Sequence, residues 1–179
     1  MDNIILGLLL LQSRTIYQLK ERINKGLNLM YSSSTGSIQA AIKKLLNSGY
    51  IDFEETVENG RHKKIYFITE QGKQHFHEWI NKPLEVQNIR CPELVKVYFM
   101  GFSDKENRVE SIQKHLSYLK EQYYTLNVIC EEAKNTEVPE NSRDIFSFQL
   151  LSACYGRDLY KFNIDWFENV LTELKDGVI

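Results

Sequence analysis

A short cationic cluster follows a turn signal in the first half of the chain. Asn59-Gly60 is a pair typical of two-residue hairpin turns, and the segments 50–57 and 64–68 on either side carry β-branched and aromatic residues. The cluster at the tip and on the second strand of this predicted hairpin consists of Arg61, His62, Lys63 and Lys64. Cations in such a position can contact phosphates along a nucleic-acid backbone or in a minor groove. The hairpin is therefore predicted to bind DNA as a wing.

A second polar surface is predicted on the helix before this hairpin, which starts within segment 31–37 and runs to about Asn47. Apolar residues repeat in it at helical spacing and predict one buried face, made of Ile38, Ala41, Ile42, Leu45 and Leu46. The opposite side is small, hydroxyl-bearing or basic, which allows close approach to base edges and contacts with phosphate. Any amphipathic helix has a polar face, so the combination with the basic hairpin is what favours DNA. The residues predicted to contact DNA here are Ser33, Ser34, Thr35, Ser37, Gln39, Ala40, Lys43 and Lys44.

The elements around these two surfaces follow the order of a winged helix-turn-helix. Residues 3–12 predict a fully buried helix, and Thr15 is the predicted N-cap of a second helix that runs to about residue 25. Gly49 supplies a left-handed stop after the third helix, and segment 69–72 opens a fourth helix that ends near Asn81. This order lets the third helix enter a major groove.

After Pro83 the pattern changes to long helices. Segment 93–102 predicts a short helix, and the next helix keeps a heptad spacing of apolar residues from Val109 to Ala133. A further long helix carries an aromatic stripe from Phe148 to Trp166. These two seams either hold a homodimer together or pack on each other within one chain, and we expect the dimer because two helices alone bury little core. The predicted dimerisation residues are Leu116, Leu119, Tyr123, Leu159, Phe162 and Trp166.

The charge is unevenly distributed along the 179 residues, although the formal net charge is only −2. Residues 1–82 hold 11 Lys and Arg against 8 Asp and Glu, whereas residues 83–179 hold 11 against 16. This asymmetry indicates that only the first half meets a polyanion. The apolar run from Ile4 to Leu11 is too short to span a bilayer, and the acidic start is unlike a signal peptide. A cytoplasmic protein without membrane contact is expected.

Residues with catalytic or metal-binding potential are few and scattered. Cys91, Cys130 and Cys154 form no CxxC pair and have no His at metal-ligand spacing, which predicts free thiols in a reducing compartment. We interpret them as small buried residues, with a redox-sensing thiol as the less favoured alternative. His75 and His77 lie two apart on a predicted helix and so point to different faces. Without a nucleophile, phosphate-loop, zinc or dinucleotide motif, neither an enzyme nor a cofactor or metal is expected.

About the first 80 residues resemble the PadR family of bacterial transcription regulators. The matching segments are Ile5-Leu6-Gly7-Leu8-Leu9, Tyr17-Gln18-Leu19-Lys20, Thr35-Gly36-Ser37-Ile38, Ser48-Gly49-Tyr50-Ile51, Asn59-Gly60-Arg61 and Tyr66-Phe67-Ile68-Thr69-Glu70-Gln71-Gly72-Lys73. Gln39, His62 and the pair Thr15-Ile16 depart from the residues usual in that family, so individual operator contacts do not carry over. The resemblance implies a homodimer on a pseudo-palindromic operator, usually acting as a repressor and sometimes released by a small aromatic ligand.

From these features we predict a mainly α protein with two domains. Residues 1–82 form a winged helix-turn-helix with a two-stranded wing, and residues 83–179 form an all-helical region for dimerisation and, by the resemblance, effector sensing. The expected partners are double-stranded DNA, a second copy of the chain and a small aromatic effector. The alternative is a winged-helix module that binds another protein and not DNA, against which the basic hairpin argues.

Overall fold

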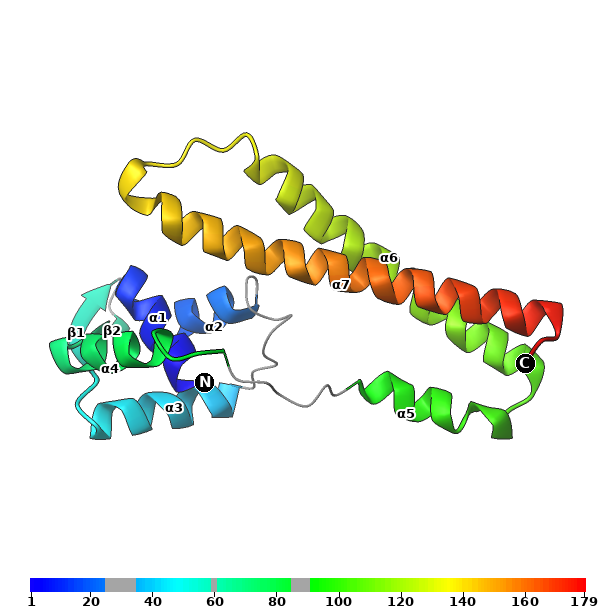
Figure 1. Cartoon of the computed structure of the whole chain (residues 1–179). Coiled ribbons are helices and arrows are strands. Elements are labelled where there is room, and N and C mark those ends of the chain that lie inside the picture. The colour runs from blue at the N-terminus through cyan, green and yellow to red at the C-terminus, as the bar shows by residue number, and fades with distance from the viewer. Residues whose placement is uncertain (25–34, 59–60, 85–90) are drawn as a thin grey trace. The chain divides into compact units, whose positions relative to one another are not determined.

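The chain forms two compact units in the computed structural model, Met1–Gln87 and Asn88–Ile179 (Figure 1). The structure describes residues 1–24, 35–58, 61–84 and 91–179, and of Glu58 and Arg61 it describes the backbone only. The division lies a few residues beyond the one predicted after residue 82. Each unit has its own cluster of buried apolar side chains, which identifies it as a separate folding unit with its own core.

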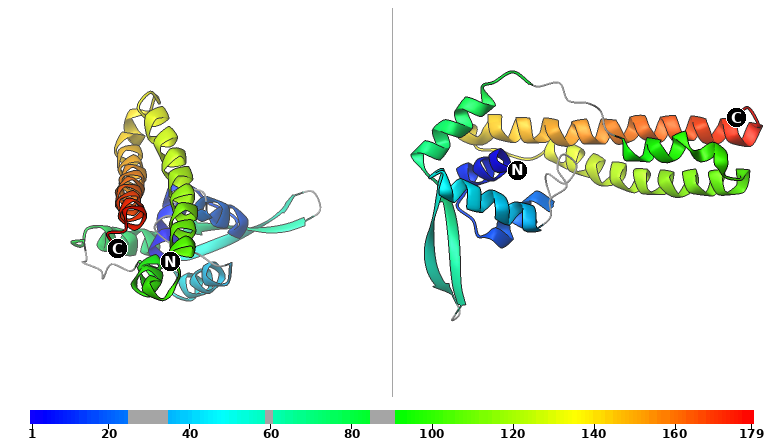
Figure 2. Two further views of the ribbon diagram at one scale, coloured as in Figure 1. Left: turned by 90° about the vertical axis from the view of Figure 1, so that its right-hand side faces the viewer. Right: turned by 90° about the horizontal axis from the view of Figure 1, so that it is seen from below.

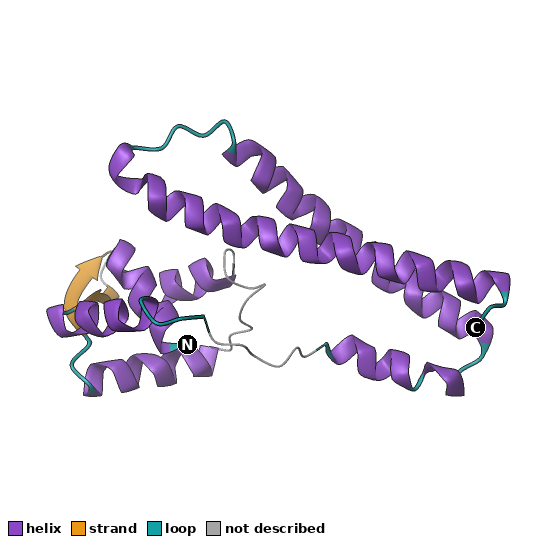
Figure 3. Ribbon diagram, viewed as in Figure 1, coloured by secondary structure: helices purple, strands orange, loops and turns teal. Residues whose placement is uncertain are grey.

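The first unit contains four described helices and one hairpin. The helices are α1 (Asp2–Leu11), α2 (Ile16–Arg22), α3 (Thr35–Asn47) and α4 (Glu70–Ile80). The strands β1 (Ile51–Glu58) and β2 (Arg61–Ile68) pair antiparallel, with Ile51 opposite Ile68 at the base and Glu58 opposite Arg61 at the far end. Figure 2 shows this hairpin as a narrow arm that extends beyond the helices of its unit, and Figure 3 marks it as the described β structure. The order of elements is that of a winged helix-turn-helix, as predicted.

The core of the first unit brings one face of each helix together with the base of the hairpin. Its fully buried side chains include Ile5, Leu6, Leu19 and Ile38. The prediction that the first helix is buried on all sides is wrong at its end, because Leu10 and Leu11 are exposed. Apolar composition alone does not determine burial, and in a small unit only the face that meets α3, α4 and β2 is covered.

Local hydrogen bonds fix the ends of the helices. The Thr15 side chain accepts a bond from the Gln18 backbone N–H at 3.2 Å, and the Thr15 backbone N–H donates to the Gln18 side chain at 2.9 Å. This capping box confirms Thr15 as the N-cap of α2. Arg14, just before it, exchanges backbone hydrogen bonds with Tyr66 at 3.0 and 2.9 Å, which ties the α1–α2 connection to β2. The predicted end of the second helix near Gly26 falls outside the described residues.

The end of α3 and the start of α4 meet in one tight junction. Gly49 has φ +69°, the left-handed conformation predicted for a stop after α3. The Thr69 hydroxyl accepts from the Gly72 N–H at 3.1 Å and donates to the Gly49 carbonyl at 2.7 Å, while the Thr69 N–H donates to the Tyr50 carbonyl at 3.1 Å. A Cβ atom on Gly72 would lie 2.0 Å from that Tyr50 oxygen. A glycine is therefore required here for close approach of the two backbones.

The second unit is helical throughout its described part. It comprises α5 (Pro92–Tyr98), the 3-10 turn η2 (Met100–Phe102), α6 (Lys105–Ala133), the turn η3 (Glu140–Ser142) and α7 (Arg143–Asp176). The predicted short helix 93–102 is thus two pieces, with Phe99 between them. Helices α6 and α7 lie side by side along most of their length (Figures 1 and 2). Asp104 caps α6 by accepting from the Asn107 N–H at 2.9 Å.

Within the ranges that the structure describes, no helix combines the length and the apolar character needed to cross a membrane.

Candidate nucleic-acid interface

Helix α3 separates its two kinds of side chain cleanly. Its apolar residues Ile38, Ala41, Ile42 and Leu45 are buried in the core of the first unit, and Leu46 is partly buried. The predicted DNA-contacting residues that the structure describes are all exposed: Thr35, Ser37, Gln39, Ala40, Lys43 and Lys44. Ser33 and Ser34 fall outside the described residues. The helix therefore has the solvent-facing polar side that a recognition helix requires.

The two adjacent lysines of α3 differ in their environment. The Lys44 ammonium lies 2.7 Å from the Asp2 carboxylate at the start of α1, and its hydrogen bond to that carboxylate raises the pKa of Lys44. Lys43 is exposed and, in the described part of the chain, takes part in no ion pair. The sequence did not distinguish the two lysines, because Asp2 lies far from them in the chain. Of the two lysines, Lys43 is the one whose charge has no ion-pair partner among the described residues and can therefore meet a phosphate.

The basic strand of the hairpin is paired with a strand rich in carboxylates. β2 contributes Arg61, Lys63 and Lys64, whereas β1 contributes four carboxylates at Asp52, Glu54, Glu55 and Glu58. Lys64 lies opposite Glu55 in the register, with its ammonium 3.3 Å from the carboxylate and 3.9 Å from the centre of the Phe53 ring. The charge of Lys64 is thus already partnered within the hairpin. The cations were visible in the sequence, but not that the pairing of the strands would place Glu55 opposite Lys64.

The register also divides the predicted cluster between two faces. Because side chains alternate along a strand, His62 and Lys64 share the face of Tyr66, whereas Lys63 belongs to the other. His62, Lys63 and Lys64 are exposed, and the side chain of Arg61 lies outside the described residues. The register therefore distributes the cations of the predicted cluster over both faces of the hairpin. A strand that continues from Arg61 to Ile68 cannot present four consecutive side chains on one side.

The predicted dimerisation residues fall into two groups in the structure. Leu116 and Leu119 of α6 are buried inside a single chain, where they pack with Ile164 and Phe167 of α7, and Tyr123 is partly buried against them. The heptad seam of α6 is thus covered by α7 of the same chain, and the expectation that these leucines face a partner is corrected. Leu159, Phe162 and Trp166 of α7 are instead exposed.

Exposed apolar side chains form two groups, the predicted stripe on α7 and a set around α5 that the sequence reasoning missed. On α7, the exposed stripe comprises Phe148, Leu151, Tyr155, Leu159, Phe162 and Trp166. On α5 and η2, the exposed residues are Leu94, Val95, Tyr98, Phe99 and Phe102. The signal was present in segment 93–102, which is apolar on more sides than one short helix can bury. Exposed apolar side chains that gather in this way make a candidate surface for contact with another molecule.

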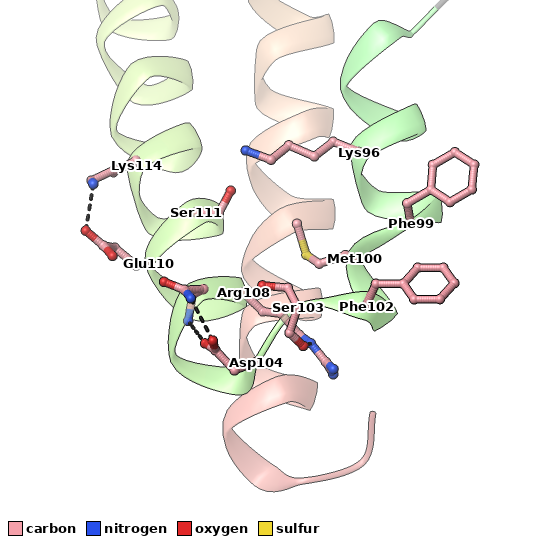
Figure 4. Close-up of a pocket in the computed structure, with 11 residues that line it drawn as sticks. Lys96, Phe99, Met100, Phe102, Ser103, Asp104, Arg108, Glu110, Ser111 and Lys114 are labelled. Carbon is pink, nitrogen blue, oxygen red and sulfur yellow. Dashed lines mark hydrogen bonds and ion pairs between the residues drawn. The ribbon is translucent and has the colours of Figure 1, made fainter.

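An open pocket of about 710 Å³ lies among α5, η2 and the first turns of α6 (Figure 4). Its charges are largely satisfied from within. Lys114 pairs with Glu110 at 2.6 Å, which lowers the pKa of Glu110, and Arg108 donates to the carbonyls of Ser103 and Gly101 at 2.8 and 3.1 Å. Phe99 and Phe102 point away from α6 in this view. Among the residues that the structure describes, no group of His, Cys, Asp and Glu could hold a metal ion.

Comparison with known proteins identifies both halves of the chain. Residues 5–78 match the family described as "Transcriptional regulator PadR-like family", and residues 89–175 match "Virulence activator alpha C-term". Together with the relative and the solved structures below, the match of the first unit supports a PadR-family regulator. This PadR-like regulator is 25% identical to "Negative transcriptional regulator PadR" of Bacillus subtilis over 177 residues, which cover 93% of each protein. The resemblance inferred from the sequence is confirmed, and the family is one of transcriptional regulators and not of enzymes.

Solved structures share the fold of this PadR-like regulator over nearly its whole length. The crystal structure of Bacillus subtilis PadR in complex with operator DNA superposes with a TM-score of 0.80 at 21% identity, covering 97% of this chain and 98% of that one. The same protein in complex with p-coumaric acid gives a TM-score of 0.75, with the same identity and coverage. These structures confirm the predicted fold class, a winged helix-turn-helix followed by a helical C-terminal region.

Proposed function

We propose that this PadR-like regulator is a homodimeric repressor that binds a pseudo-palindromic operator through the exposed side of α3. The observation that carries the proposal is the polarity of α3, whose buried face holds it in the core while its small, hydroxyl-bearing and basic side stays open. The operator complex of Bacillus subtilis PadR, which shares the fold, supports DNA as the partner. Such a regulator acts in the cytoplasm, where its operator is.

Within this proposal the residues of α3 have different tasks. Thr35 and Ser37 lie in the first turn, where their hydroxyls can meet a phosphate at the positive end of the helix. Gln39 and Ala40 face the base edges, and Lys43 contacts a phosphate further along. Lys44 has a smaller part, because its ammonium is held by Asp2.

The hairpin contributes less to DNA binding than the number of its basic residues would imply. Lys63 and Arg61 lie toward its far end, where the wing can follow the DNA backbone or enter the minor groove. Lys64 is bound to Glu55 and Phe53, so it stiffens the arm instead of meeting DNA. His62 lies opposite the exposed Val57.

The dimer is proposed to form through α7 and α5. The stripe defined by Leu159, Phe162 and Trp166 is apolar, exposed and continuous along one side of a long helix. Burying it removes large aromatic side chains from water, which is the main source of stability in obligate dimer interfaces. A symmetric operator requires such a dimer to hold its two copies of α3 about one helical turn of DNA apart, roughly 34 Å.

Repression and release by a small aromatic ligand are the finer parts of the proposal. The full-length relative from Bacillus subtilis is named a negative regulator, which favours repression, although the C-terminal match takes its name from an activator. The p-coumaric acid complex of that relative's structure favours an aromatic effector. A reporter gene placed under the protein's own promoter distinguishes repression from activation. Deletion of a repressor raises expression of the reporter, whereas deletion of an activator lowers it.

The DNA-binding proposal is tested by fluorescence anisotropy with a duplex taken from upstream of the protein's own gene. Lys43→Gln removes one phosphate contact per chain, so the slope of log affinity against log salt should fall by about 0.9 per contact, or about 1.8 for a dimer. Lys175→Gln, the same change of charge in the last turn of α7, is the matched control and should leave the slope unchanged. Equal slopes for both variants and the unaltered protein would reject α3 as the DNA-contacting helix.

A second candidate function has one specific observation in its favour. The four carboxylates of β1 offset the cations of β2, as is expected of a hairpin that contacts a protein and not a polyanion. Under this alternative, anisotropy detects no binding of duplex DNA at low salt, and the isolated regulator is captured by a protein partner through the hairpin. An affinity for duplex DNA that falls steeply with rising salt concentration favours the DNA-binding regulator over the protein-binding module.

A further inference from the structure

Two cysteines that are far apart in the sequence meet between α6 and α7. The Sγ atoms of Cys130 and Cys154 lie 3.2 Å apart, although the residues are 24 positions apart in the chain. Both are free thiols in this structure. Cys130 is 1% exposed, whereas Cys154 is partly open to solvent. One buried and one reachable thiol in direct contact form an arrangement that the spacing of the cysteines did not reveal.

We propose that Cys130 and Cys154 are a reversible redox modification site, at which a hydroperoxide converts the two thiols into an intrachain disulfide. The sulfurs need to approach by only a little over 1 Å to reach the roughly 2.05 Å of a disulfide bond. Each cysteine lies within a regular helix, so side-chain rotation about Cα–Cβ supplies most of this movement. Cys91, the third cysteine, precedes α5 and lies far outside the pair in sequence.

The reaction begins at Cys154, because its sulfur is the one that an oxidant can reach. Its thiolate attacks one oxygen of the hydroperoxide, an S–O bond forms, the O–O bond breaks, and an alcohol or water leaves. Cys130 then attacks the Cys154 sulfur, an S–S bond forms, and the hydroxyl leaves as water with the proton of the Cys130 thiol. Two thiols lose two electrons and the peroxide gains them. A dithiol reductant reverses the bond.

The surroundings of the pair support this order of events. Burial raises the pKa of the Cys130 thiol to about 11, so this thiol stays protonated until the sulfur of Cys154 has been activated. Arg157, one turn beyond Cys154, places a positive charge within electrostatic reach of both sulfurs, while Asp158 opposes it at Cys130. In the described residues no third ligand completes a metal site with the two thiols.

The position of the pair gives the bond a structural consequence. The apolar cluster that joins α6 to α7 runs from Ile112 to Leu119 on one helix and from Ile164 to Leu174 on the other. Toward the connecting loop, Cys130 is the next buried residue of α6, and Gly156 is the buried residue of α7 in that region. A disulfide would therefore hold the end of the helical pair that has the least packing of its own.

The test uses the full-length protein with Cys91→Ser, so that only the pair can react. After brief treatment with hydrogen peroxide and alkylation of the remaining thiols, intact mass and a peptide map should show one intrachain Cys130–Cys154 bond and the loss of two hydrogen atoms. The bond should form at least tenfold faster in the folded protein than in the same protein in urea, since folding holds the sulfurs together. Its thermal unfolding temperature should rise by about 5 °C or more.

Single-thiol variants separate the two roles. With Cys91 and Cys130 both replaced by Ser, Cys154 should form a sulfenic acid that dimedone traps; with Cys91 and Cys154 replaced, Cys130 should be trapped at least tenfold more slowly. The proposal is overturned if the folded and urea-treated proteins cross-link equally fast, if the bond joins two chains, or if Cys130 is trapped first. None of these measurements involves DNA, so the result is independent of the proposed function.

Discussion

Replacing Gly72 by alanine should destabilise the winged-helix unit, although alanine normally favours a helix. At an ordinary interior position the exchange stabilises a helix by about 1 kcal/mol. Here the new Cβ would lie 2.0 Å from the Tyr50 carbonyl oxygen and 2.9 Å from Cγ1 of Ile68. The start of α4 has to move by more than 1 Å to relieve these contacts, which strains the hydrogen bonds of Thr69 to Gly49 and Tyr50.

The expected loss is about 2–4 kcal/mol, from overpacking and from weakened hydrogen bonds that are worth about 1 kcal/mol each. Urea denaturation followed by circular dichroism measures it, with the transition of the winged-helix unit assigned by Trp79 fluorescence. Gly101→Ala is the matched control, because a Cβ there meets nothing within 4 Å, and its effect should stay within about 0.5 kcal/mol. A Gly72→Ala protein as stable as the parent would refute the close-approach argument and with it the explanation of the Thr-Glu-Gln-Gly motif.

Further substitutions test the remaining parts of the account. Leu119→Ala should lower the free energy of unfolding of the α6–α7 unit by about 2–5 kcal/mol in denaturant titrations, because the leucine is buried within one chain. Phe162→Glu, on a side chain that is 64% exposed, should leave that stability nearly unchanged but convert a dimer to a monomer in analytical ultracentrifugation, and Tyr124→Glu on the outer side of α6 should not. Asp2→Asn should lower the pKa of Lys44, measured by NMR titration, and steepen the salt dependence of DNA binding by freeing its ammonium. Burial raises the pKa of the Cys130 thiol to about 11 from 9.0, so on raising the pH the thiol is deprotonated in the unfolded chain before it is in the folded one. The free energy of unfolding should therefore stay constant below pH 9 and fall as the pH rises toward 11. Cys130→Val should reduce this fall, as measured by denaturant unfolding at a series of pH values.

The local elements could be predicted from the sequence because local residues determine them. Thr15 acts as an N-cap, Gly49 adopts the left-handed conformation, and the apolar stripe of α3 is buried as its spacing required. Strand β2 begins three residues before the predicted start at Lys64, since pairing with β1 extends a strand beyond its most β-prone residues.

What could not be predicted depends on which segments meet. The heptad spacing of α6 identified an apolar seam, but not that α7 of the same chain would cover it. The basic residues of the hairpin were visible, whereas the partition of their side chains between two faces follows from the register with β1. Asp2 with Lys44, and Cys130 with Cys154, are contacts between distant positions that no pattern in one sequence encodes.

The orientation of α3 toward DNA is tested most directly by site-specific photo-cross-linking. A photoreactive amino acid replaces Ala40, which is exposed on the polar side of α3, and in a separate protein it replaces Glu173 of α7 as the control. Both proteins are bound to the same duplex from upstream of the gene and irradiated. The account predicts cross-links from position 40 to bases within the protected site and none from position 173. Full binding of the duplex without a cross-link from position 40 would contradict it.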